Sequence, residues 1–492
     1  MKITINIVYK VILIFLESNS ILLVKISNII RSSFSYDPTP GQKKLFLLFD
    51  NFLEQKEKKG TILIKGYAGT GKTTIVDALV QVLPRFDYKY VLLAPTGRAA
   101  KVLASYSGRQ AFTIHKIIYK QVPDSESGGI RFVSQKNYSK KTVFIVDEAS
   151  MIPDRIGFSG QSLLRDLLVY VFEHDSNKLI LIGDVAQLPP VGLDVSLGLD
   201  TGYLEQTYGL NLREVELKDV VRQEAVSGIL HNATRLRALL QTDNFQLQLR
   251  TSGMNDVYNM THEKLEDGLR YAYDKYGQDQ TIIVCRSNWQ AVQYNTYIRR
   301  MIFYYEDEIQ AGDILMIVKN NYFFLGDDSP AGFIANGDFV ELRKIVSFEE
   351  KFGLRFATLD LQMLDYPEME PFRAKVILDT LTSKTPAMTQ EENKKLYSSV
   401  LEEYIDLDLS SKKMKEAIRQ DEYLNALQIK FAYALTCHKS QGGQWKVVFL
   451  DQGYRQNQEV DREYIRWMYT AFTRAEKELY LINFPEEFFS NS

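Results

Sequence analysis

The fold of this chain is decided by the stretch GYAGTGKT, residues 66–73. It follows the apolar run ILI at residues 62–64, and a helical pattern begins directly after it. Strand, glycine-rich turn and helix in this order are the context of a phosphate-binding P-loop. Backbone N–H groups and the helix N-terminus hold phosphate oxygens in such a loop. The stretch therefore predicts a site for a nucleoside triphosphate.

The side chains of this loop have distinct expected roles. Lys72 is expected to reach the β- and γ-phosphates, and the Thr73 hydroxyl to ligate Mg²⁺. Further contacts with the nucleotide are expected from Gly69, Thr70, Gly71 and Thr74.

Polar residues follow two later apolar strands, at the strand ends where ligands bind in open parallel sheets. Asp147 and Glu148 come after the run VFIV at residues 143–146. We expect Asp147 to hold Mg²⁺ and Glu148 to orient or deprotonate the attacking water. Gln187 follows the run at residues 179–182, and its amide can both donate to a γ-phosphate and accept from water.

The strand pattern indicates the fold class. Apolar runs at residues 281–284, 447–450 and 479–482 are continuous rather than alternating. Strands that are buried on both faces of a parallel sheet have this pattern. The chain is therefore predicted to be α/β with two sheets.

Two segments depart from this pattern. Between about residues 302 and 426 alternating strands and turn signals predict a small β-barrel, followed by a charged helical stretch over residues 389–426. The polar piece at residues 119–141 predicts a β-hairpin with glycines at its centre.

Length and composition are ordinary for a globular protein. The 492 residues predict about three domains, and the net charge of −3 leaves the class of partner open. Cys285 and Cys437 are too few for a disulfide framework or a cysteine-based zinc site, and they fit a reducing cytoplasm.

The N-terminus is apolar from Ile3 to Leu16, with small residues at 18–20, as in a signal peptide. Lys10 and Glu17 interrupt the run, and a membrane span needs about 20 apolar residues. We therefore expect a non-catalytic leader and no stable membrane association.

Seven motifs in order resemble those of the superfamily 1 DNA helicases, RecD/Dda-like branch. They are GYAGTGKTT at 66–74, APTGRAAK at 94–101, VDEAS at 146–150, GDVAQLPPVG at 183–192, VVRQ at 220–223, TCHKSQGGQW at 436–445 and YTAFTRAEKELYLI at 469–482. The resemblance extends from about Thr39 to Asn483.

The resemblance implies further nucleotide contacts. Gln42, in Thr39-Pro-Gly-Gln, matches the residue that reads adenine, although such a sequence alone is a helix N-cap. Arg222 and Arg474 match two arginine fingers, which stabilise charge in the transition state. Gln441 and Gly442 match the nucleotide side of their motif.

The resemblance also implies a path for single-stranded DNA, bound without base readout. Its expected contacts are Pro95, Thr96, Arg98, Thr113, His115, Arg286, Asn288, Thr436, His438 and Ser440. For His115 a packed histidine is an equal alternative. Cys437 beside His438 is not expected to be a thiol nucleophile, because nothing else of such a site is evident.

For the fold, the resemblance implies two RecA-like domains, with the hairpin as an insert in the first and the barrel as an insert in the second. The expected division is a leader at 1–35, the first motor domain at 36–215, the second at 216–300 and 427–492, and the insert at 301–426. The hairpin would be the strand-separating pin, with Phe132 as a candidate wedge.

The implied function is an ATP- and Mg²⁺-dependent DNA helicase that travels 5′-to-3′. Two alternatives stay open: a translocase that separates no duplex, and a RecD-like motor subunit of an exonuclease complex. Expected partners are single-stranded DNA, duplex junctions and replication or repair proteins. We expect a monomer in the cytoplasm.

Overall fold

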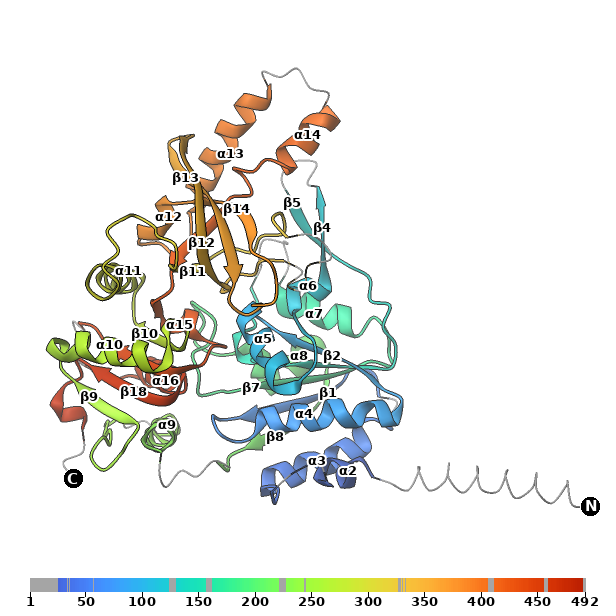
Figure 1. Ribbon diagram of the computed structural model, residues 1–492. Coiled ribbons are helices and arrows are strands. Elements are labelled where there is room, and N and C mark those ends of the chain that lie inside the picture. Colours follow the sequence, from blue (N-terminus) through green and yellow to red (C-terminus); the bar gives the residue numbers. More distant parts are fainter. Residues whose placement is uncertain are drawn as a thin grey trace, which may run out of the picture.

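A computed structural model of the chain describes residues 25–489, except 33, 35, 56, 124–129, 156–161, 221–226, 243–244, 326–328, 330, 332, 406–410 and 455–458. Two parallel sheets form its base, and a closed barrel lies above them (Figure 1). The predicted α/β class, with two parallel sheets, a hairpin and a barrel, is confirmed.

The first sheet has the strand order β3-β2-β6-β7-β1-β8, and all its pairs are parallel. Its strands are β1 (Gly60–Gly66), β2 (Lys89–Ala94), β3 (Ala111–Thr113), β6 (Thr142–Val146), β7 (Lys178–Gly183) and β8 (Asn211–Leu217). Its helices are α3 (Pro40–Phe52), α4 (Lys72–Val82), α5 (Gly97–Ser107), α6 (Ile114–Ile118), α7 (Leu163–Val171) and α8 (Thr201–Tyr208).

Alternate side chains of the central strands enter two different cores. Ile62 and Ile64 join the core under α3 and α4, whereas Leu63 between them joins the core under α6 and α7. Because both faces are covered by helices, a continuous apolar run is required. The carboxyl ends of these strands are left to carry the polar site.

The segment assigned to the leader is partly packed. Helix α2 (Ile26–Ser32) lies against α3, and its Ile30 is fully buried. Ser27 donates hydrogen bonds to Asp50 from its N–H at 2.8 Å and its Oγ at 2.7 Å. The packed part of the chain thus begins before residue 36, because an amphipathic turn follows the apolar run. Residues 1–24 lie outside the described residues.

The second sheet has the order β16-β10-β17-β18-β9, again with parallel pairs. Its strands are β9 (Val257–Met260), β10 (Thr281–Cys285), β16 (Ala434–Thr436), β17 (Trp445–Asp451) and β18 (Ala475–Ile482). Its helices are α9 (Gly228–Leu239), α10 (Leu265–Tyr276), α11 (Asn288–Tyr297), α15 (Cys437–Ser440) and α16 (Arg462–Phe472).

The barrel closes with β11 (Ile314–Ile317), β12 (Phe339–Lys351), β13 (Leu354–Met363), β14 (Phe372–Ile377) and β15 (Leu427–Phe431). Strand β15 was expected in the second motor domain, but it pairs with β11 and β14. Its fully buried side chains fit a barrel wall as well as a parallel sheet, so the pattern alone could not separate the two. The expected division of the chain otherwise stays a prediction.

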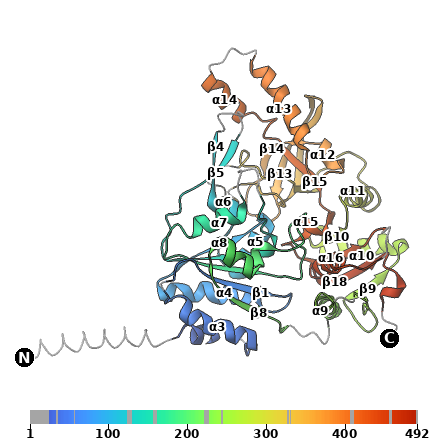
Figure 2. The same cartoon turned by 180° about the vertical axis from the view of Figure 1, so that it is seen from behind.

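Short helical elements extend the barrel. They are α12 (Asp379–Thr382), which lies beside the barrel strands, and α13 (Gln390–Ile405) and α14 (Ser411–Arg419), which lie at one end of the molecule in both views (Figure 2). The predicted hairpin is formed by β4 (Tyr119–Pro123) and β5 (Ile130–Ser134), which pair antiparallel. The tip glycines and the Phe132 side chain lie outside the described residues.

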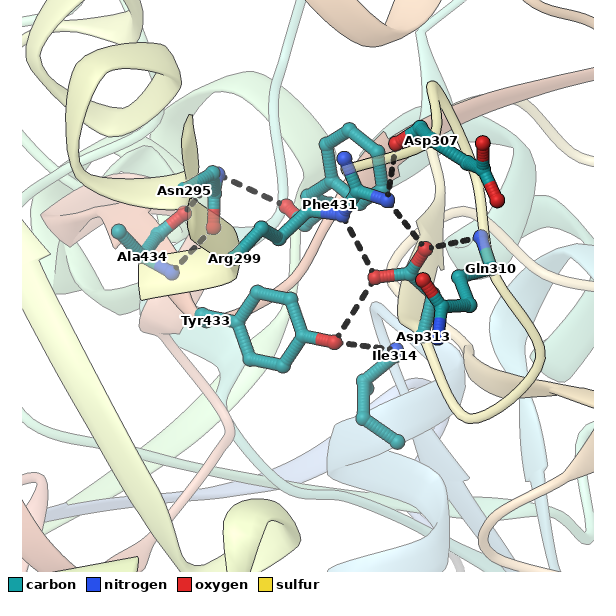
Figure 3. A network of polar contacts seen from close by, with 9 residues as sticks. All are labelled: Asn295, Arg299, Asp307, Gln310, Asp313, Ile314, Phe431, Tyr433 and Ala434. Carbon is teal, nitrogen blue, oxygen red and sulfur yellow. Dashed lines mark hydrogen bonds and ion pairs between the residues drawn. The ribbon is translucent and has the colours of Figure 1, made fainter. Parts of the chain in front are cut away.

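A buried polar network fixes the barrel to the second sheet (Figure 3). Arg299 donates to both carboxylate oxygens of Asp313, at 2.8 and 2.9 Å, and the Tyr433 hydroxyl donates to the same group at 3.1 Å. Asn295 donates to the carbonyls of Phe431 and Ala434 and accepts from the Ala434 N–H. Both chain crossings between sheet and barrel are therefore held at one place.

In the part of the chain that the structure describes, no helix has the length and apolar character needed to cross a membrane.

Candidate functional site

The P-loop connects β1 to α4 at the carboxyl edge of the first sheet. Gly69 and Gly71 have φ angles of 78° and 82°, which only glycine adopts readily. Lys72 Nζ donates to the carbonyls of Gly66 at 2.7 Å and Tyr67 at 2.9 Å. These contacts hold the ammonium group beside the first turn of α4, where the helix dipole favours anions.

The acidic pair ends strand β6 beside this loop. Asp147 Oδ1 accepts from the Glu148 N–H at 2.9 Å, and Asp147 Oδ2 accepts from the Tyr106 hydroxyl at 2.5 Å. Burial raises the pKa of Glu148, and the Asp147 carboxylate raises it further. The cations of Arg474 and Lys72 act in the opposite direction. The pair thus lies between the P-loop and a cation from the second sheet.

The loop after β7 carries Asp184 and Gln187, both buried. Asp184 Oδ1 accepts from the Ala186 N–H at 2.9 Å, and burial raises the pKa of the Asp184 carboxyl. Gln187 Oε1 is buried without a hydrogen-bond partner in the described part of the chain. An unpaired buried acceptor is costly, so Gln187 is suited to receive a bond from a ligand or water.

Helix α16 and the turn before β17 reach this loop from the second sheet. The Tyr469 hydroxyl donates to Asp184 at 2.6 Å and accepts from the Ala68 N–H of the P-loop at 2.9 Å. Thr470 Oγ1 accepts from the Leu188 N–H at 2.9 Å, and Gln441 donates to the Leu188 carbonyl at 2.8 Å. The phosphate loop and the Asp184 loop are therefore completed by the second sheet.

Of the two expected arginine fingers, only Arg474 can be located. It is 4% exposed, and its guanidinium donates to the carbonyls of Thr470 and Gly443, each at 3.0 Å. It acts electrostatically on both Glu148 and Asp184. Arg222 lies outside the described residues, so its role stays a prediction.

The residues expected to hold Mg²⁺ fit that ion. Thr73 and Asp147 offer the hydroxyl and carboxylate oxygens that Mg²⁺ prefers. No group of three or more His, Cys, Asp or Glu side chains could hold a metal within the described residues. An ion shared with nucleotide phosphates and water needs few protein ligands, and it would neutralise the phosphate charge.

The side chain of Gln42, which was expected to bind adenine, is hydrogen-bonded within the protein. Its Oε1 accepts from the Thr39 N–H at 3.0 Å in a capping box, and its Nε2 donates to the Thr70 carbonyl at 3.1 Å. Its side chain is fully buried. Gln42 thus supports the P-loop from α3, and the adenine contact stays a prediction.

Two of the residues expected to contact DNA from the first sheet are N-cap residues of its helices. Thr96 caps α5 by accepting from the Ala99 N–H at 3.2 Å, and Thr113 caps α6 by accepting from the Lys116 N–H at 3.3 Å. Pro95 precedes Thr96 in the turn after β2. Burial lowers the pKa of His115, whose ring lies 5.6 Å from that of Tyr119. His115 is partly buried against Tyr119, and the choice between a packed histidine and a DNA contact stays open.

Arg98 departs from the expected DNA contact. Its guanidinium lies 4.4 Å from the ring centres of both Phe339, on β12, and Trp445, on β17. Beside it Lys101 pairs with Asp338 at 3.1 Å and Asp365 at 3.0 Å. The first turns of α5 therefore hold barrel and second sheet together, which sequence spacing could not reveal.

The expected contacts of the second sheet divide in two. Arg286 is exposed, Asn288 begins α11, and both Thr436 and His438 lie at the short helix α15. Ser440, by contrast, is fully buried, and its hydroxyl donates to the Cys437 carbonyl at 2.8 Å. Because its hydroxyl is buried and already donates a hydrogen bond within α15, Ser440 is poorly placed to contact DNA.

Close packing explains the glycine at 442. It has a φ of 72°, and a Cβ there would lie 2.8 Å from the Cβ of Ala99. Gly442 thus lets the second sheet approach α5, and its expected nucleotide contact stays a prediction. Cys285 and Cys437 are free and buried, and burial raises the pKa of both thiols, as expected for unreactive cysteines.

Sequence reasoning missed Tyr106, Asp184, Tyr469 and Thr470. Asp184 follows a strand end just as Asp147 does, and the other three lie in or near quoted motifs. The hydrogen bonds of the Tyr106, Tyr469 and Thr470 hydroxyls could not be predicted from motif spacing, because their partners lie far away in the sequence. Tyr469, for example, is separated from Ala68 by 401 residues.

Fold and site together define a P-loop nucleotide-binding protein whose phosphate loop is bounded by two parallel sheets. Family models agree: an AAA domain matches residues 49–251, and a UvrD-like helicase C-terminal domain matches residues 431–482. An AAA domain followed by a UvrD-like helicase C-terminal domain is a helicase arrangement, and the chain is similar in sequence to superfamily 1 helicases of the Dda and RecD type.

Among curated relatives, an uncharacterized protein of Acanthamoeba polyphaga mimivirus is 25% identical over 87% of this chain and 96% of its own length. The ATP-dependent DNA helicase dda of Enterobacteria phage T4 is 33% identical over 38% of this chain. The ATP-dependent RecD2 DNA helicase of Deinococcus radiodurans is 29% identical over 40%. The chain spans only 40% and 24% of these two helicases.

Solved structures of Pif1 helicases are also similar. One, of two Pif1 helicases coordinating at forked duplex DNA, has a TM-score of 0.48 and 15% identity, covering 93% of this chain and 95% of that chain. Another, of Bacteroides Pif1 with ADP-AlF3 and single-stranded DNA, has a TM-score of 0.46 and 14% identity, with the same coverage.

Proposed function

We propose that the chain is an ATP-driven motor that moves 5′-to-3′ along single-stranded DNA and separates duplex DNA. The observation that carries the proposal is the bond from the Ala68 N–H of the P-loop to Tyr469 of the second sheet. Because one hydroxyl joins the two, a change at the phosphates alters the contact between the sheets. Such coupling is what a motor with two domains requires.

The residues at the phosphate loop support ATP hydrolysis. A raised pKa makes the Glu148 carboxylate a stronger base toward water, provided that it is ionised. Gln187 offers a buried amide oxygen for the same water. Lys72 and Arg474 supply positive charge where negative charge develops on the phosphates.

DNA binding is supported by the helix N-termini and polar side chains at the carboxyl edges of the two sheets. The caps formed by Thr96 and Thr113 place helix N-termini in the loops at the carboxyl edge of the first sheet. Arg286, Asn288, Thr436 and His438 lie at the corresponding edge of the second sheet. Helix N-termini and cations are the usual partners of DNA phosphates, so the path is expected to cross both sheets.

The test is strand displacement on two duplexes, one with a 5′ single-stranded tail and one with a 3′ tail. ATP hydrolysis is followed in the same reactions, and Lys72→Ala is the control that should lose both activities. Displacement of the 5′-tailed duplex alone supports the proposal. Displacement of the 3′-tailed duplex alone reverses the polarity.

Hydrolysis stimulated by DNA, but without displacement, identifies instead a translocase or a motor subunit that needs a partner complex. Absence of hydrolysis by the wild-type chain would contradict the proposal altogether. The monomeric state, the cytoplasmic location and the replication or repair partners stay predictions.

A further inference from the structure

Helix α5 touches the rest of the molecule at both ends. At its N-terminal end Arg98 lies between Phe339 of the barrel and Trp445 of the second sheet. One turn later Lys101 binds Asp338, whose side chain is 2% exposed, and Asp365. The N-terminal half of α5 is therefore fixed to the barrel and the second sheet rather than to its own sheet alone.

At its other end α5 touches the acidic pair. The Tyr106 hydroxyl donates to Asp147 Oδ2 at 2.5 Å, while Asp147 Oδ1 accepts from the Glu148 N–H. The tyrosine hydroxyl is the donor in this pair, because a carboxylate can only accept. Both oxygens of Asp147 thus have fixed partners, and one of those partners belongs to α5.

We propose that Tyr106 is a positioning residue, which sets the orientation of Asp147 and connects it through α5 to the barrel. The proposal rests on the proposed function, because it deepens the role of Asp147 as a ligand of the Mg²⁺ ion that accompanies the nucleotide. Tyr106 acts through the carboxylate oxygen that it binds, and this role requires no contact of its own with nucleotide or ion.

The physical argument is the stiffness of a short helix. Eleven residues of α-helix span about 16 Å, and a packed helix moves as a unit. A shift of the barrel against α5 is therefore passed on to Tyr106 rather than absorbed along the helix. Since the other oxygen of Asp147 is held by the Glu148 N–H, a shift of Tyr106 changes the orientation of the carboxylate.

The first experiment measures Mg²⁺ dependence without turnover. A fluorescent ADP analogue is bound to the full chain while Mg²⁺ is titrated, for wild type and for Tyr106→Phe. We expect the Mg²⁺ midpoint to rise up to about tenfold in the variant, because partners of metal ligands contribute on that scale. An unchanged or lower midpoint overturns the proposal. Thermal melting checks that the variant is folded.

Tyr294→Phe is the matched control. The hydroxyl of Tyr294, on α11, also donates to a carboxylate at 2.6 Å, but that carboxylate belongs to Asp451 at the end of β17 in the second sheet. This variant should keep the wild-type Mg²⁺ midpoint. A shift as large as that of Tyr106→Phe would make the effect a general one of losing a tyrosine bond, and would overturn the proposal.

The connection through α5 is tested by a double-mutant cycle. Tyr106→Phe and Lys101→Gln are compared, singly and together, for the ratio of ATPase rates with and without saturating oligo-dT. We expect each to lower the ratio several-fold and the pair to lower it no further. Strictly multiplicative effects would overturn the connection. Wild type without ATPase activity would refute the proposed function, while the Mg²⁺ titration would still decide the role of Tyr106.

Discussion

Glu148 combines two unusual features in one residue. Its backbone has a φ of 52°, in the left-handed region that residues other than glycine seldom adopt. Its carboxyl is buried beside a second carboxylate, which raises its pKa. Strained backbones and shifted pKa values both gather at functional sites. The position therefore favours a base that must be ionised before it can act.

The prediction at this scale concerns the base itself. Glu148→Gln should keep nucleotide and DNA binding but lower the ATPase kcat by about 10²–10⁴, the usual contribution of a general base. In wild type the acidic limb of the rate–pH profile should lie above the ordinary pKa of glutamate, about 4.5, because the pKa is raised. Activity should fall as the pH drops through that limb. Wild-type turnover by the variant would refute the assignment.

Helix α5 shows how much of an element the sequence can reveal. Its start was predictable, because Thr96 follows an apolar strand and can cap a helix. The direction of its side chains was not predictable: Lys101 meets Asp338 across 237 residues of sequence. Periodicity tells which residues share a helix face but not which element covers it. For the same reason Arg98 was expected at DNA and is found between two aromatic rings.

The prediction for this element separates the two readings of Arg98. Arg98→Gln should lower the free energy of unfolding by about 1–2 kcal/mol, because two cation–π contacts are lost. Urea denaturation measures the loss, and Arg98→Lys should restore only part of it, since lysine stacks less well. Unchanged stability, with a salt dependence of DNA affinity that is weaker by about 0.7 in slope, would favour the DNA contact instead.

At the scale of the whole molecule, strand runs and motif order sufficed to predict two parallel sheets and a barrel. They could not assign β15 to the barrel rather than to the second sheet, because a run of five buried residues fits both. Nor could they show that one apolar core continues from the second sheet into the barrel. Where sheet and barrel meet, Arg299 and Asp313 form an ion pair whose side chains are 8% and 0% exposed.

This junction carries the prediction for the molecule as a whole. Arg299→Met should destabilise the chain by about 3–5 kcal/mol, because it leaves the Asp313 charge buried and unpaired. Arg299→Met combined with Asp313→Leu should recover much of that loss, since no charge then remains. Thermal or urea unfolding of four proteins, the wild type, the two single variants and the double variant, measures the difference. A double variant as unstable as the sum of the single ones would contradict the pairing.

The same junction has a consequence for how such a chain can be remodelled. The Ala432 N–H donates to the Ile314 carbonyl at 2.9 Å, and the Ile314 N–H donates to the Tyr433 hydroxyl. The entrance and exit of the barrel thus lie within one hydrogen bond of each other. The barrel is therefore an insertion whose two ends, near Ile314 and Ala432, could be joined by a few residues without changing the order of the parallel strands. Removal or exchange of the barrel would keep the order of the parallel strands, but it would expose the core that the second sheet shares with the barrel.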